Sequence, residues 1–132
     1  MSSSNRGRPF EGARELVAHA QGLAVLPYFA LANGFLGGQV RRRSEVRRDA
    51  RGERLARHLG RRGHRVLTAL DEIAFAHGVQ PATIALATGA ATVGFARSHA
   101  SATRPDQVEA LMTAASVELH RSELVELDRA SA

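Results

Sequence analysis

The turn "SATRPDQ", residues 101–107, carries residue types that suit phosphate binding. Thr103 and Asp106 have the spacing of a capping box, which predicts a helix from this point through about Met112. The N-terminus of a helix presents free N–H groups and a partial positive charge, and the guanidinium of Arg104 can grip a phosphate with two parallel hydrogen bonds. The turn indicates an anion site, although a capped surface helix with one solvated arginine would explain the same residues.

The stretch "LPYFALANGFLGG", residues 26–38, has an unusual composition for a loop. Its small residues and three glycines would fill a hydrophobic core poorly, and it contains more apolar residues than an ordinary solvent-exposed linker. We therefore expect a ligand to lie against this backbone, which small residues would allow it to approach closely. The alternative is an ordinary loop packed by Phe35 and Leu36.

Several other chemistries are excluded by residue types that are missing. The chain has no cysteine and no lysine, so disulfides, thiolate chemistry, Schiff-base lysines and a P-loop lysine are ruled out. The six histidines lack the spacing of metal ligands. No apolar run is long enough to span a membrane and no secretory segment is visible, so a cytoplasmic protein is expected.

Positive charge is concentrated in residues 41–65, which hold eleven arginines against Glu45, Asp49 and Glu53. This segment is expected to be either a solvated, helix-forming insert or a flexible excursion. It also supports a second hypothesis, nucleic-acid binding with steeply salt-dependent affinity. Against that hypothesis, the segment contains no aromatic residue to stack on a base.

Apolar periodicity and turn residues predict an alternating order of elements. Helices are expected over 9–21, from Val66 to Gly78, over 81–91, from about 103 to 112 and over 122–130 with Ser122 as cap; strands are expected over 23–28 and 92–96, and a loop over 32–40. Such alternation predicts an α/β fold with a parallel sheet. Only two strands are convincing, so the chain is predicted to be one partial domain, residues 1–132.

Three stretches in order, "VLPYFALANGFLGG", "RVLTALDEIAFAHGVQPATIALA" and "SATRPDQVEAL", resemble landmarks of the aldo/keto reductase family, and "VELHRSELVELDRAS" is similar to that family's tail. The resemblance covers about residues 9–131, least well in the Arg-rich insert. It implies the C-terminal portion of a (β/α)8 TIM barrel, with about two parallel strands and five or six helices. It also implies NADPH as cofactor and the reduction of carbonyls to alcohols.

The resemblance also implies roles for particular residues. Tyr28 would stack on the nicotinamide, and the loop positions Phe29, Leu31 and Asn33 would lie along the pyrophosphate. The residues of the second site would be Ser101, Thr103 and Arg104 at the adenosine 2′-phosphate and Gln107 near the adenine.

The family's Asp, Tyr, Lys and His catalytic set has no counterpart here. The chain has no lysine, and its single tyrosine, Tyr28, maps to the stacking position. No catalytic residue is therefore predicted, and the chain is expected to be inactive alone. It would need an N-terminal half-barrel partner, or it is a structural remnant that forms a homodimer to cover exposed strand edges.

Overall fold

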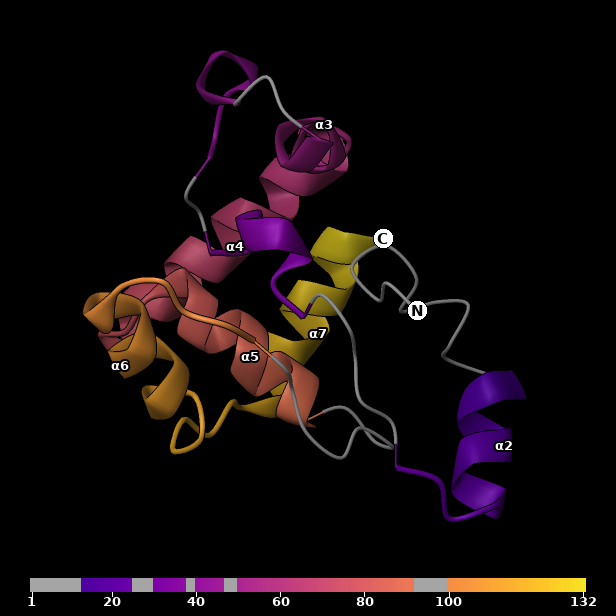
Figure 1. The fold of residues 1–132 in the computed structure, drawn as a ribbon. Coiled ribbons are helices and arrows are strands. Elements are labelled where there is room, and N and C mark those ends of the chain that lie inside the picture. The colour runs from indigo at the N-terminus through magenta and orange to yellow at the C-terminus, as the bar shows by residue number, and fades with distance from the viewer. Residues whose placement is uncertain (1–12, 25–29, 38–39, 47–49, 92–99) are drawn as a thin grey trace.

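The computed structural model of this chain describes residues 13–24, 30–37, 40–46, 50–91 and 100–132 (Figure 1). The α-helices are α2 (Ala13–Ala20), α3 (Ala50–Ala56), α4 (Arg61–His77), α5 (Pro81–Ala91), α6 (Pro105–Thr113) and α7 (Arg121–Ser131). Two short 3-10 helices, η1 (Ala32–Gly34) and η2 (Arg43–Glu45), precede α3.

The predicted α/β fold, a partial (β/α)8 barrel with two parallel strands, is wrong for the described part of the chain. That part is helical and contains no strand. Residues 25–28 and 92–96, which make up nearly all of the two predicted strands, lie outside the described residues, and Leu23 and Ala24 are irregular. The apolar faces of α4, α5 and α7 pack against one another.

The main core lies where α4, α5 and α7 meet. Figure 1 shows α5 and α7 lying against α4, and the buried cluster joins side chains from all three helices. Leu70 and Ile73 come from α4, Ile84 from α5 and Leu127 from α7, and Ile84 is completely buried. The apolar face predicted for the helix that follows Val66 is thus confirmed, because its residues at helical spacing do form the core.

Gly78 ends α4 as predicted. Its φ of 65° lies in the left-handed region, which favours glycine, and its N–H donates to the carbonyls of Ala74 and Phe75. The helix begins at Arg61, five residues before the predicted apolar pattern, so it takes up the end of the Arg-rich segment. The helix predicted over 81–91 is confirmed with the same bounds.

A second buried cluster anchors the Arg-rich segment to the core. Leu55 of α3 and Leu59 pack with Phe35 and with Leu67 of α4. In addition, Arg41 makes a bidentate ion pair with Asp71 of α4. Of the two alternatives for this segment, the helix-forming insert is therefore the one observed over Ala50–Ala56.

The caps predicted for the last two helices are wrong. α6 begins after Arg104, which makes no side-chain capping bond, and the Asp106 carboxylate pairs with the guanidinium of Arg104. The N-cap of α7 is His120, two residues before the predicted cap, so Ser122 lies inside the helix. At α6 a side-chain pair takes the place of the expected Thr cap, whereas at α7 the Glu123 carboxylate accepts the backbone N–H of His120.

The helix predicted near the N-terminus is present as α2, but its large apolar side chains stay exposed. Leu16 is 71% exposed and Val17 is 53% exposed, whereas the small Ala18 is buried. Figure 1 shows α2 apart from the other helices. Among the described helices, none has the length and apolar character needed to cross a membrane.

Candidate functional site

The turn before α6 brings together most of the polar side chains predicted to bind phosphate. Ser101, Thr103 and Arg104 are all exposed, and they precede the first residue of α6 directly. The backbone N–H of Thr103 donates to Oε1 of Gln107 at 2.8 Å, and the Thr103 hydroxyl lies 3.2 Å from the same oxygen. Gln107, which lies one helical turn after Thr103, therefore stabilises the conformation of the turn.

Arg104 has a partner of its own in this turn. Its guanidinium donates to both carboxylate oxygens of Asp106, from Nε at 3.1 Å and from Nη2 at 2.7 Å. These hydrogen bonds lower the pKa of Asp106, and the side chains of the pair are 64% and 53% exposed. An exposed pair of this kind is weak, so a phosphate that binds at the turn competes with one carboxylate for the guanidinium.

Two hydroxyls and a guanidinium beside a helix N-terminus are the donor types that a phosphate monoester accepts. The donor types of this turn therefore suit a phosphate monoester. Ser101, Thr103 and Arg104 could hold one, and the exposed position of all three leaves the approach from solvent open.

The other predicted cofactor segment is only partly described. Tyr28 and Phe29 lie outside the described residues, and Asn33 is placed only as a member of η1. Leu31 precedes η1, and its carbonyl accepts the N–H groups of Gly34 at 2.9 Å and Leu36 at 3.3 Å. That carbonyl is thus used inside the loop itself.

The side chains of this loop pack into the protein. Phe35 is 3% exposed and stacks on His58, and Leu36 contacts both buried clusters. This is the packing that the alternative of an ordinary loop predicts. No hydrogen bond or ion pair between described residues joins this loop to the turn 101–107.

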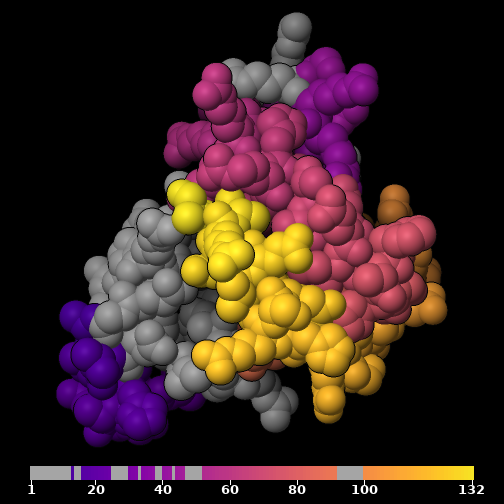
Figure 2. Space-filling view, turned by 180° about the vertical axis from the view of Figure 1, so that it is seen from behind, coloured from indigo at the N-terminus to yellow at the C-terminus, as the bar shows by residue number. Residues whose placement is uncertain are grey.

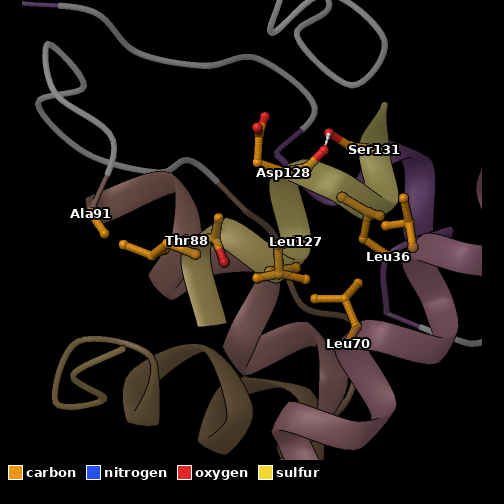
Figure 3. Close-up of a pocket in the computed structure, with 10 residues that line it drawn as sticks. Leu36, Leu70, Thr88, Ala91, Leu127, Asp128 and Ser131 are labelled. Carbon is orange, nitrogen blue, oxygen red and sulfur yellow. Dashed lines mark hydrogen bonds between the residues drawn. The ribbon is translucent and has the colours of Figure 1, made fainter. Parts of the chain in front are cut away.

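An apolar cavity of about 360 Å³ opens between α4, α5 and α7 (Figure 3). Leu36, Leu70 and Leu127 form its apolar wall, and Asp128 and Ser131 stand on one side. The Ser131 hydroxyl donates to the backbone carbonyl of Asp128 at 2.9 Å. No basic side chain is part of the described lining, so the cavity suits an apolar group and does not suit a pyrophosphate.

A cluster of titratable side chains that the sequence did not reveal joins α4 to α7. Nε2 of His77 lies 2.8 Å from Oε1 of Glu123, and the other oxygen of Glu123 accepts the backbone N–H of His120 at 2.7 Å. The spacing of His120 and Glu123 could have indicated half of this arrangement. Nothing local indicated His77, which is 46 residues away from Glu123. No group of three or more metal-ligand side chains is found among the described residues.

Protonation of the Glu123 carboxylate is expected to make the protein less stable in acid. Partial burial raises its pKa, but the hydrogen bonds from His120 and His77 outweigh this and leave the pKa below its ordinary value of 4.5. A carboxylate with a lowered folded-state pKa stabilises the protein above the unfolded-state pKa, and that contribution is lost as the pH falls through the folded-state pKa.

Glu123→Gln should therefore lower the free energy of unfolding by about 1 kcal/mol at neutral pH, and by much less at a pH well below the ordinary glutamate pKa of 4.5. Urea unfolding of both proteins at the two pH values measures this difference. The exposed Glu126→Gln on the same helix serves as control and should have little effect at either pH. An equal loss for Glu123→Gln at both pH values would contradict a role for the charge.

The comparisons with known proteins agree with the order of the sequence motifs. The model of the aldo/keto reductase family matches residues 6–132, which is nearly the whole chain. A search of curated proteins gives no match. The match includes the loop before α3, the helices α4 and α5, the turn before α6 and the closing helix α7. This chain therefore belongs to the aldo/keto reductase family.

Proposed function

We propose that this chain is a cytoplasmic protein that binds NADPH through the turn 101–107 and does not reduce carbonyls alone. The observation that carries the proposal is the exposed donor set of Ser101, Thr103 and Arg104 at the start of α6, within a chain of the aldo/keto reductase family. Gln107, which is bonded to Thr103, would lie beside the adenine. Tyr28, Phe29, Leu31 and Asn33 remain the proposed contacts of the nicotinamide and pyrophosphate.

The absence of the family's catalytic set supports the second half of the proposal. Bound NADPH supplies a hydride, and a carbonyl accepts it productively only when a protein group also delivers a proton. The chain has no lysine, and its only tyrosine is proposed to stack on the nicotinamide. Carbonyl reduction would therefore require a partner chain that carries the proton-donating acid. If the partner is instead a second copy of this chain, its role would be structural only.

A thermal melt with and without NADPH tests cofactor binding directly. A ligand that binds only the folded state raises the midpoint by mass action, so about 1 mM NADPH should raise it measurably and NADH should raise it less. A cooperative melt that neither nucleotide shifts would contradict the proposal.

The variant Arg104→Ala should weaken NADPH binding about tenfold and leave NADH binding nearly unchanged, because one charge-assisted contact to the 2′-phosphate is lost. The matched control is Arg121→Ala, which removes another exposed arginine beside a helix start. Titration calorimetry with both nucleotides measures the difference. Equal losses for NADPH and NADH would contradict the assignment of the 2′-phosphate site.

Breaking the ion pair in the turn should have the opposite effect on NADPH affinity. Asp106→Asn removes the carboxylate that engages the Arg104 guanidinium, so NADPH should bind a few-fold more tightly. A gain for NADPH that NADH does not share would tie the effect to the 2′-phosphate.

A further inference from the structure

Five exposed arginines form a basic surface on α3, on the turn after it and on the start of α4. We call this the arginine surface, and its members are Arg54, Arg57, Arg61, Arg62 and Arg65. Figure 2 shows the residues of α3 and of the start of α4, in magenta, gathered at one end of the molecule. Glu53 is the only acidic residue between 52 and 66, and none of the five arginines makes an ion pair with another described residue.

Packing beneath the arginine surface holds the two helices in fixed positions. Leu55 and Leu59 are 6% and 8% exposed and pack toward Leu67, so the helical repeat turns the arginines outward. Gly63 lets the start of α4 lie directly on the preceding turn, because a Cβ there would be 1.8 Å from the carbonyl oxygen of His58. The positive charges therefore project from a rigid base.

A cavity of about 240 Å³ lies at the edge of the arginine surface. Its lining includes Phe35, His58 and Gly63, together with Arg57 and Arg62 from the surface itself. The rings of Phe35 and His58 are stacked, with centroids 5.3 Å apart and an interplanar angle of 29°. Burial and the neighbouring Arg57 lower the pKa of His58, which favours the neutral form of the ring.

The side chains of the arginine surface and its cavity distinguish between two polyanionic partners, an anionic lipid bilayer and a nucleic acid. A bilayer surface is recognised by basic residues interleaved with apolar side chains that insert into it. The leucines of residues 52–65 are buried, and no large apolar side chain is exposed there. Residues 41–65 contain no Phe, Tyr or Trp, but the fold brings Phe35 from outside this segment against the imidazole of His58. An aromatic wall beside two guanidiniums matches the chemistry of single-stranded nucleic acid, whose unstacked bases and phosphates are both accessible.

We propose that the arginine surface and its cavity bind single-stranded nucleic acid, with a base against His58 and the flanking phosphates on Arg57 and Arg62. A duplex would reach the arginines but would keep its bases stacked and away from the cavity. Single strands are therefore expected to bind more tightly than a duplex of the same length.

Fluorescence anisotropy of labelled oligonucleotides with the full chain tests this proposal. Saturable binding of an oligo-U strand at about 50 mM salt is expected, with an affinity that falls linearly on a log–log scale as salt rises. An abasic strand of the same length should bind at least about threefold more weakly, since it lacks the stacking contribution. Equal binding of the abasic strand, or tighter binding to anionic vesicles, would overturn the proposal.

A matched pair of double variants distinguishes binding at the cavity from non-specific attraction to the protein's positive charge. Arg57→Ala with Arg62→Ala should weaken oligo-U binding at least about tenfold and reduce the salt slope by about 1.4, which corresponds to two phosphate contacts. Arg121→Ala with Arg129→Ala removes the same charge from α7, whose two arginines do not line the cavity, and should change the affinity less than about twofold. Equal losses in the two variants would overturn the proposal. All four positions are exposed, and unchanged thermal midpoints would establish that both variants fold.

Discussion

Replacing Gly63 with alanine is expected to lower the free energy of unfolding by about 3 kcal/mol. The added Cβ would lie 1.8 Å from the backbone oxygen of His58 and 2.8 Å from the ring of Phe35. A backbone oxygen cannot move aside as the end of a flexible side chain can, so the turn between α3 and α4 must shift. Because Phe35 belongs to the cluster that anchors α3, the strain is expected to reach both helices.

Denaturant unfolding of Gly63→Ala and Gly60→Ala measures this effect with a close control. Gly60 lies three residues earlier, and a Cβ there would meet no atom within 4 Å. Its φ of −124° is open to alanine, so the control should lose less than about 1 kcal/mol. Similar losses in the two variants would contradict the close approach of α4 to the preceding turn. If the proposed nucleic-acid site is correct, Gly63→Ala should also weaken oligo-U binding, because the same shift deforms the cavity wall.

Replacing Ile84 with alanine should cost about 3–4 kcal/mol of folding free energy. Ile84 is completely buried on α5, where it packs with Leu70 and Ile73 of α4 and with Leu127 of α7. Truncation removes three side-chain carbons and leaves a cavity among three helices that can close only in part. For a protein of marginal stability, this loss is a large fraction of the total.

Thermal and denaturant unfolding of Ile84→Ala should show either a strongly lowered midpoint or no cooperative transition. The control is Val125→Ala on α7, where the side chain is 42% exposed and the loss should be within about 0.5 kcal/mol. A loss below about 1 kcal/mol for Ile84→Ala would contradict the packing of α5 against α4 and α7.

The helices were predictable because local periodicity encodes them. The apolar spacing from Val66 to Ala74, the glycine at 78 and Pro81 located α4 and α5 within a few residues. The caps of α6 and α7 were not predictable in the same way. There, Asp106 pairs with Arg104 two residues away, and Glu123 accepts the backbone N–H of His120 three residues away. These contacts are local but compete with the expected Thr and Ser caps, and only the contact of Glu123 with His77 depends on the tertiary fold.

The expected α/β layer was the largest error. Continuous apolar runs of strand length predicted a sheet, but nearly all of those residues lie outside the described part of the chain. In the described part, the apolar faces of α4, α5 and α7 are buried against one another. A helix pattern specifies that one face must be buried, but it does not specify whether a strand or another helix covers it.

Several properties follow from the amino-acid sequence without any coordinates: membership of the aldo/keto reductase family, the lack of lysine and the concentration of positive charge between residues 41 and 65. The sequence also determined which residues share a helix face. Only the folded chain shows which faces meet, that His77 lies against Glu123, and that Phe35 lies beside His58 at the edge of the arginine surface. The physical reason is that spacing along the chain is a local property, whereas burial and charge pairing depend on residues far apart in sequence.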